Sequence, residues 1–400
     1  MEEKKVSVII PVYNTAQWLP DCLESVIGQD YENLQIICIN DGSTDETPRI
    51  LESYAAKDRR ILIIDQANHG AGYARNQGLE RANGDYVLFV DSDDKLMDGI
   101  IRKMAVRAEK DGLDFLRCSG ETIFDTEELS KRFSKFRFQH DYPGTFSGLS
   151  LFSEWYKNRE FTAAPYRTLY RRPFLERFGI RFPNLMNYED ELWTYQVCLF
   201  AECCGVLPET GYIRRYRDGS LMTKPVTIED VSCYYQTFIY MTQLCYDHRV
   251  KVKCYPEFTN YPNIVLKSAS RIYKTHSSEI NGQARDDLDR AMLRELELVP
   301  LPGTPRKITQ SELEKQKAEM TAEHDRQMRE VSKKLSEEIQ KRAVLEKQNG
   351  VLKRSERQLR NALSDVYRSS SWKVGNFIVR PFHSIRKKLK RLIVNKKGRS

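Results

Sequence analysis

Long apolar segments are missing from this 400-residue sequence. No run approaches the roughly 18 residues that a helix needs to cross a bilayer. The first residues, MEEKKVSVIIPVYN, carry acidic side chains and an early proline where a secretory signal has a basic start and an apolar core. We therefore expect the chain to act in the cytosol, and any membrane contact to be peripheral.

The sequence also lacks cysteine pairs of the kind that bind zinc or form disulfides. Its nine cysteines are odd in number and scattered, and Cys38 and Cys198 lie within apolar runs. The adjacent Cys203 and Cys204 do not have the C-x-x-C spacing and the matching histidine of a zinc site. We interpret the cysteines as reduced residues of the core.

Glycine is missing after the first apolar run, where the sequence continues Pro11-Val12-Tyr13-Asn14. A dehydrogenase would carry G-x-G-x-x-G at this place, so that class of enzyme is disfavoured. A sugar nucleotidyltransferase, which could share the fold, should have a glycine-rich phosphate loop here. A sugar nucleotidyltransferase is the alternative function, although the sequence has no such glycine here.

Acidic residues are absent from residues 372–400, which contain ten lysines and arginines. Since the whole chain has a net charge of +8, the first 371 residues carry a net charge of −2. Apolar residues are interleaved with the basic ones: Trp372, Phe377, Ile378, Val379, Phe382, Ile385 and Leu389. This pattern is typical of a segment that lies on anionic lipid headgroups, with a solvated end as the alternative. Nucleic-acid binding is not expected, because no recognisable module accompanies the charge.

The first hundred residues repeat a short apolar run, a polar cluster and a helical stretch. The runs are VSVIIPV from Val6, LQIICIN from Leu34 and YVLFV from Tyr86, with a weaker run, ILII, at Ile61. The three strong runs are apolar on both faces, as are the strands of a parallel sheet covered by helices. The pattern predicts a βαβαβ arrangement of the α/β class.

The next segments differ in composition. Residues 1–223 form the expected catalytic domain, with a helix around Asp190–Ala201. Residues 224–300 have helical apolar spacing around Val231–Leu244 but no chemistry that we can assign from sequence. They are interpreted as a helical buttress or linker domain.

The C-terminal part begins with LPGTP, which marks a linker over residues 301–309. Residues 310–368 are nearly free of glycine and proline, and apolar residues recur at heptad positions: Leu345, Leu352, Leu359 and Val366. This predicts a coiled coil that would join copies of the chain into a homo-oligomer, with a solvated single helix as the alternative. Residues 369–400 form the basic amphipathic tail.

Acidic residues follow two of the predicted strands. Asp41 ends the run from Leu34, and Asp91-Ser92-Asp93-Asp94 follows the run from Tyr86. The carboxyl ends of parallel strands meet at one edge, where ligands bind. Carboxylates gathered there need a cation or ligand hydroxyls, and Mg²⁺ or Mn²⁺ bound to a diphosphate meets that need. A turn followed by a helix cap is the alternative explanation.

These segments resemble the motifs of family-two glycosyltransferases, inverting enzymes of the GT-A fold. The matching motifs, in the family's usual order, are VSVIIPVYN, INDGSTDET, NHGAGYARNQGLERANGDYVLFVDSDD, FPNLMNYEDELW and YRDGSLMT. They span about residues 5–223. The resemblance implies an α/β fold, with a Rossmann-like GT-A domain that binds a nucleotide sugar and a C-terminal helical and coiled-coil extension.

For the nucleotide, the resemblance makes Asp41 a contact of the base, with Val12 and Tyr13 as its backbone and ring neighbours. Arg75, in the segment ARN, would approach the base or the diphosphate. The alternatives are a surface helix charge for Arg75 and a packed core ring for Tyr13.

For the diphosphate, Asp91 and Asp93 correspond to the family's DXD motif. Asp91 would contact the ribose and the metal shell, and Asp93 would be the principal ligand of Mn²⁺ or Mg²⁺. Arg217 and Ser220 resemble the segment that closes over the donor, where a cation can pair with the diphosphate.

For the acceptor, Asp190 matches the family's catalytic base, and Glu189 beside it either orients the acceptor or forms a salt bridge. The base would take the proton of an acceptor hydroxyl as its oxygen attacks the anomeric carbon. One displacement from the opposite face inverts the anomeric configuration.

The resemblance implies transfer from a nucleotide diphosphate sugar, with UDP favoured by family frequency, to a glycan or a lipid-linked acceptor. The Gln-x-x-Arg-Trp segment of polymerising members is absent, which favours transfer of a single sugar. A non-catalytic coiled-coil scaffold is a further alternative. It would be expected to have lost Asp93 or Asp190, and the sequence keeps both.

Overall fold

The structure is a computed structural model that describes residues 3–132, 137–217 and 225–301. Residues 1–299 form one compact unit and residues 300–400 a second, so the fold below is that of the first unit. The predicted coiled coil over 310–368 and the basic tail over 369–400 lie outside the described residues.

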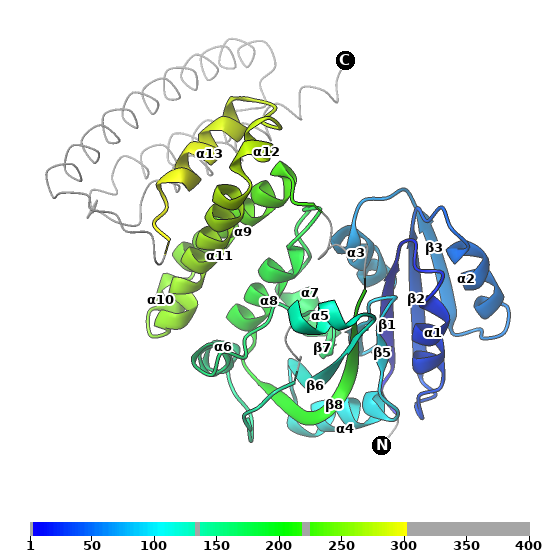
Figure 1. The fold of residues 1–400 in the computed structure, drawn as a ribbon. Coiled ribbons are helices and arrows are strands. Elements are labelled where there is room, and N and C mark those ends of the chain that lie inside the picture. The colour runs from blue at the N-terminus through cyan, green and yellow to red at the C-terminus, as the bar shows by residue number, and fades with distance from the viewer. Residues whose placement is uncertain (1–2, 133–136, 218–224, 302–400) are drawn as a thin grey trace, which may run out of the picture. The chain divides into compact units, whose positions relative to one another are not determined.

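An eight-stranded sheet in the order β3-β2-β1-β4-β7-β6-β8-β5 runs through this unit (Figure 1). Its first four strands are parallel: β1 (Val6–Val12), β2 (Leu34–Asp41), β3 (Ile61–Gln66) and β4 (Tyr86–Phe89). They are linked by helices α1 (Leu19–Ile27), α2 (Thr47–Ala55) and α3 (Ala71–Arg81). The predicted βαβαβ arrangement is confirmed. The weak run at Ile61 forms the edge strand, which explains its partial exposure.

Helices cover both faces of the parallel strands, and β1 is buried along its whole length. Side chains of α1, α2 and α4 (Ile100–Asp111) join one face in the main core cluster. Helix α3 packs closely on the other face at Gly78, where an added Cβ would lie 2.4 Å from Ile9. Only glycine allows the helix to approach this near, so the site residues of α3 are held tightly against the sheet.

The second half of the sheet is mixed. Strand β7 (Thr168–Arg171) pairs antiparallel with both β4 and β6 (Phe115–Phe124), and β6 runs parallel to β8 (Cys204–Tyr216). The remaining elements are β5 (Lys95–Leu96), α5 (Glu127–Arg132), α6 (Gly148–Lys157), α7 (Arg172–Arg177) and α8 (Glu189–Phe200). Helix α8 confirms the helix predicted around Asp190–Ala201.

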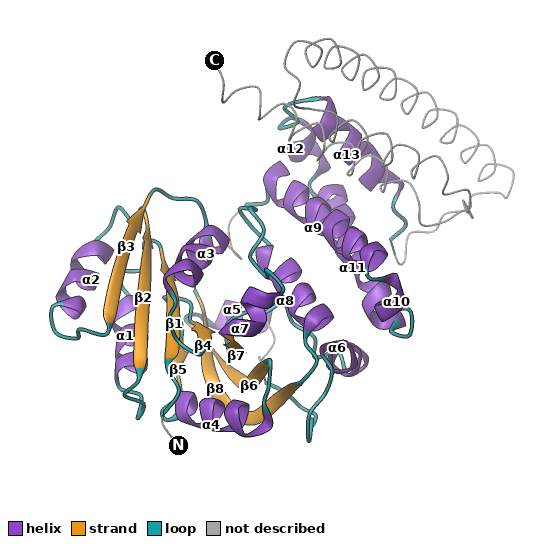
Figure 2. Cartoon of the chain, turned by 180° about the vertical axis from the view of Figure 1, so that it is seen from behind, coloured by secondary structure: helices purple, strands orange, loops and turns teal. Residues whose placement is uncertain are grey.

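The described residues after 224, which end at residue 301, are mainly helical. The helices are α9 (Ile228–Asp247), α10 (Arg249–Val252), α11 (Pro256–Thr275), α12 (Ser277–Asn281) and α13 (Asp287–Leu298). Helices α9, α11 and α13 pack on one another around a small core of their own (Figure 2). Helix α9 also packs against α8. The predicted boundary at residue 223 stays a prediction. Across the described part of the chain, every helix is too short or too polar to span a membrane.

Candidate active site

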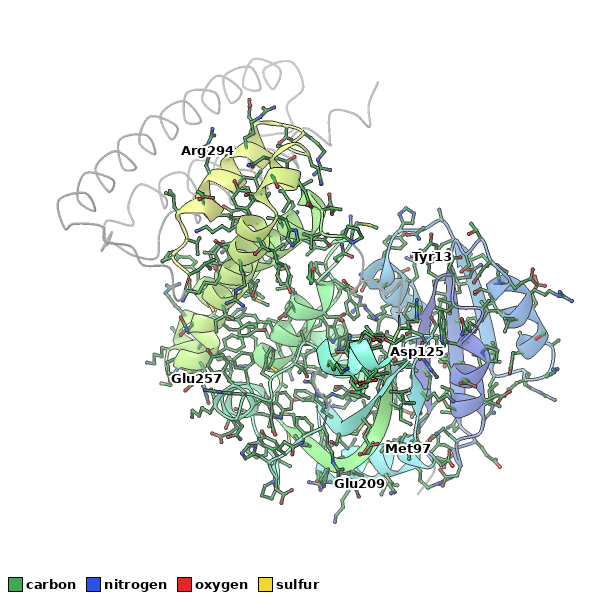
Figure 3. All side chains as sticks on the ribbon, viewed as in Figure 1. Tyr13, Met97, Asp125, Glu209, Glu257 and Arg294 are labelled. Carbon is green, nitrogen blue, oxygen red and sulfur yellow. The ribbon has the colours of Figure 1, made fainter. Side chains whose placement is uncertain are left out.

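The carboxyl ends of β1, β2 and β4 lie at one edge of the sheet, because these strands are parallel neighbours in register. Val12 ends β1 and is buried, whereas the next residue, Tyr13, is 47% exposed at the rim of the parallel half (Figure 3). Asp41 ends β2, and Asp91 follows two residues after β4. The structure thus brings together the strand-end residues that the sequence predicted.

Asp41 shapes the loop that leads into α3. Its carboxylate accepts hydrogen bonds from the backbone N–H groups of His69 (2.9 Å) and Gly70 (2.8 Å) and from the amide of Gln66 (2.7 Å). Gly70 has φ +89°, a conformation that favours glycine. Asp41 therefore fixes the start of the helix that carries Arg75, and its predicted contact with the nucleotide base stays a prediction.

Arg75 is the centre of the site. Its guanidinium is buried and forms ion pairs with Asp91 (2.8 Å), Glu189 (2.8 Å) and Asp190 (3.1 Å). Burial opposes the charge of Arg75, but the three carboxylates outweigh it and raise the pKa of the guanidinium above its ordinary range. One cation thus links the strand-end Asp91 to the first turn of α8, so it is neither a surface charge nor isolated.

Glu189 and Asp190 face this cation to different degrees. The side chain of Glu189 is 9% exposed and touches Gly72, where an added Cβ would lie 2.8 Å from its Cγ. Glu189 therefore forms the salt bridge that was one of its two alternatives. Asp190 is 26% exposed and is the more accessible of the two to a substrate.

Burial raises the pKa of Asp190 well above its usual range. Arg75 opposes this shift, while the charges of Glu189 and Asp91 add to it. The pKa of Glu189 is raised as well, again mainly by burial. A carboxylate with a raised pKa, kept near a cation, is suited to accept a proton.

The aspartates after β4 have distinct partners. Asp93 forms an ion pair with Nε of Arg217 (2.7 Å), whose guanidinium lies 4.2 Å from the ring centroid of Trp18. Asp94 is buried and accepts hydrogen bonds from the hydroxyl of Tyr212 (2.6 Å) and the backbone N–H of Arg215 (2.8 Å). Asp94 therefore anchors β8 beside the site.

Several partners could not be found from the sequence. Tyr212 bridges the turn, because its hydroxyl also accepts the N–H of Asp91. Arg214 lies over the rings of Tyr166 and Tyr216. Isolated aromatic and basic residues give no pattern that marks them as neighbours of a site. Ser220 lies outside the described residues.

A divalent cation would need further ligands from a substrate. In the parts of the chain that the structure describes, no three His, Cys, Asp or Glu side chains converge to hold a metal. Asp91 and Asp93 offer carboxylates on one turn, with 27% and 21% of their side chains exposed. Mg²⁺ is commonly held by one or two carboxylates together with substrate phosphates and water. The two aspartates fit an ion bound in that way.

Comparison with known proteins identifies the family. Residues 7–179 match the family model described as "Glycosyl transferase family 2". The uncharacterized glycosyltransferase YibD of Escherichia coli is 30% identical over 260 residues, which cover 64% of this chain and 75% of YibD. The Bacillus subtilis protein EpsH is 30% identical over 233 residues, which cover 56% of this chain and 64% of EpsH, just under two thirds of its length.

Among solved structures, S. aureus TarS 1–349 in complex with UDP-GlcNAc superposes with a TM-score of 0.52 at 23% identity. The match covers 73% of this chain and 79% of that one, and at this identity it shows a shared fold. Sequence, family model and fold agree, and the chain belongs to glycosyltransferase family 2, with a mixed α/β fold of the GT-A type.

Proposed function

We propose that the chain transfers one hexose from a nucleotide diphosphate sugar to a hydroxyl of a glycan or lipid-linked acceptor, with inversion and with Mn²⁺ or Mg²⁺. The observation that carries the proposal is the placement of Asp91 and Asp190 on the single guanidinium of Arg75. A donor-side and an acceptor-side carboxylate thereby share one guanidinium, so a donor and an acceptor bound at them would be held close together, as a direct displacement requires.

In this proposal Asp190 is the catalytic base. A sugar hydroxyl is a weak nucleophile at neutral pH, so a positioned carboxylate must take its proton during attack. The buried surroundings raise the pKa of Asp190 and favour proton uptake, while the charge of Arg75 opposes that shift and favours the carboxylate form. Because the attack is a single displacement and Asp190 never bonds to the sugar, the anomeric configuration inverts.

The donor would lie along the strand ends. Asp41, Val12 and Tyr13 would contact the base and Asp91 the ribose. Arg217 and Ser220 would belong to the segment that closes over the donor, with Arg217 as the cation that pairs with the diphosphate. Asp93, with Asp91, would hold a divalent cation, which when bound neutralises charge on the departing diphosphate. Arg217 already lies on Asp93, within reach of that position. Since TarS was crystallised with UDP-GlcNAc, UDP is the first nucleotide to test.

The C-terminal part would determine where in the cell the enzyme is held. The coiled coil over 310–368 would join copies of the chain, and the tail over 369–400 would hold them on the anionic inner face of the plasma membrane. A lipid-linked acceptor in polysaccharide synthesis gives a cytoplasmic enzyme a reason to be there. This rests on the sequence pattern alone.

The test is release of UDP from a panel of UDP-sugars, with and without Mn²⁺. Asp190→Asn should bind UDP as the wild type does but lose turnover by roughly a hundredfold or more, the scale of general-base catalysis. Asp98→Asn, at an exposed aspartate outside the site, is the matched control. Equal losses of UDP binding and turnover in Asp190→Asn would mark Asp190 as a donor ligand. Absence of release with every sugar would favour the scaffold.

A further inference from the structure

The segment Asn187–Glu191 is held from two sides. On one side, Arg75 of α3 pairs with Glu189 and Asp190. On the other, helices α9 and α11 contact the residues before and after that pair. These contacts are a hydrogen bond from Asn187 to Asp230 (2.8 Å), ring stacking of Tyr188 on Tyr234 (centroids 3.8 Å apart), and a hydrogen bond from Tyr261 to Glu191 (2.9 Å).

Tyr188 is in an unfavourable conformation. It has φ +62° immediately before the first residue of α8, although it is a bulky residue without the freedom of glycine. Such a residue stays left-handed only when its surroundings hold it there. Stacking on Tyr234 supplies one such hold, and the resulting backbone turn sets where Glu189 and Asp190 point.

Asp230 connects the same segment to the first turn of α9. One of its oxygens accepts the amide of Asn187, and the other accepts the backbone N–H (2.9 Å) and the hydroxyl (2.9 Å) of Thr227. The carboxylate is buried, with 2% of the residue exposed. A single side chain thus caps α9 and fastens that helix to the residue before Tyr188.

From these contacts we infer that α9 and α11 position the catalytic base, with Asp230 and Tyr234 as positioning residues that act through Asn187 and Tyr188. This rests on the proposed role of Asp190. The helices have a separate core, formed by residues such as Ala269, Leu293 and Leu296, so they are stable for reasons other than the contact with α8. The helices therefore do not need the contacts with Asn187 and Tyr188 for their own packing, and we assign these contacts the role of orienting Asp190.

The experiment uses the full-length chain, with Asn187→Ala and Tyr234→Ala compared in the UDP-release assay. Each should lower kcat by about tenfold to a hundredfold, the cost of a small misplacement of a reacting group, while UDP affinity stays unchanged. Thr227→Ala is the matched control, because it removes the hydroxyl that donates to the other oxygen of Asp230 and leaves the backbone N–H bond to that oxygen and the bond from Asn187. It should keep the wild-type kcat. Tyr234→Phe keeps the stacked ring and should restore kcat.

Thermal unfolding of each variant checks that it folds. Tyr234→Leu, which keeps apolar volume without a ring, replaces Tyr234→Ala if that variant does not fold. The inference is overturned if kcat stays at the wild-type value in Asn187→Ala and in the ringless Tyr234 variant. It is also overturned if Thr227→Ala lowers kcat as much as Asn187→Ala does. The same holds if Asn187→Ala or the ringless Tyr234 variant lowers kcat and UDP affinity together.

Asp190→Asn in the same assay separates the two proposals. If Asp190→Asn loses turnover while the α9 variants keep it, the positioning role is wrong and the proposed function stands. If Asp190→Asn keeps full turnover, the base assignment fails, and the positioning role fails with it.

Discussion

The donor-side edge of the sheet and the helices on the acceptor side are built in different ways. At the donor side, Asp41 and Asp91 reach one edge through the register of parallel strands. At the acceptor side, each contact joins distant parts of the chain: Arg75 and Glu189 are 114 residues apart, Asn187 and Asp230 are 43 apart, and Glu191 and Tyr261 are 70 apart. Strand order alone places the first set, whereas the second depends on how whole helices pack.

Arg75 joins the two regions, so its removal should have the largest effect. In Arg75→Ala, Asp91, Glu189 and Asp190 would lose the guanidinium that pairs with all three, and the charge of Arg214 would be left to act on Asp190. We expect UDP release to vanish and the free energy of unfolding to fall by roughly 3–5 kcal/mol, as when one partner of a buried ion pair is removed. Activity assays and urea unfolding measure both effects.

The pH dependence of the stability of Arg75→Ala tests this electrostatic explanation. Without Arg75 the already raised pKa values of Glu189 and Asp190 rise further, so the folded variant binds protons that the unfolded chain does not. Its stability deficit should therefore shrink as pH falls from 8 towards about 5. Arg75→Lys keeps the positive charge without the forked geometry of the guanidinium. Its stability should lie between the stabilities of the wild type and Arg75→Ala. Wild-type stability in Arg75→Ala would show that the three ion pairs contribute nothing.

Asp93→Ala tests the donor side alone. Loss of the principal proposed ligand should weaken UDP binding in the presence of Mn²⁺ by at least the roughly tenfold that even an outer-shell partner of a metal costs. Binding of UDP without metal serves as the internal control and should not be weaker in the variant, because the variant keeps Arg217 and loses only a negative charge beside it. Calorimetric titration with UDP measures both. Unchanged UDP binding in the presence of Mn²⁺ would show that Asp93 is not a ligand of the metal.

The donor-side edge of the sheet was predictable from the sequence to a larger extent than the acceptor side. The parallel sheet, helix α8 and the strand-end residues were predicted, because short periodic patterns and strand order determine them. The partners of Arg75 were not, since a guanidinium on one helix gives no sign of which distant carboxylates will surround it. Asp94 shows the same limit: it stands in the DSDD motif, yet its contacts with Tyr212 and Arg215 make it an anchor for β8.

The titration of Glu191, on the acceptor side, should have a smaller effect on stability. Burial raises the pKa of its carboxyl from the ordinary value of 4.5 to about 7, and the hydrogen bond from the hydroxyl of Tyr261 opposes the shift. Because the folded state binds the proton more tightly, the stability from Glu191 is present at low pH and is lost as pH rises through about 7.

Glu191→Gln keeps a partner for Tyr261 and removes the titration. Between pH 5 and 8 the wild type should lose on the order of 2 kcal/mol more stability than this variant, on the scale of 1.36 kcal/mol per pKa unit. Urea unfolding at the two pH values measures the difference. Parallel pH profiles for the two proteins would contradict a buried, protonated Glu191.

Removal of residues 310–400 should have the smallest effect on catalysis, because every described site residue lies between Val12 and Arg217. We expect the shortened chain to release UDP at the wild-type rate, to be monomeric, and to stop co-sedimenting with anionic vesicles. Removal of residues 372–400 alone should abolish vesicle binding and keep the oligomer. Two tails on one oligomer matter because a single amphipathic segment dissociates quickly, whereas a second, tethered segment rebinds at high effective concentration. A shortened chain that stays oligomeric, or full-length protein that ignores anionic vesicles at low salt, would refute these roles for the C-terminal part without touching the assignment of Asp190.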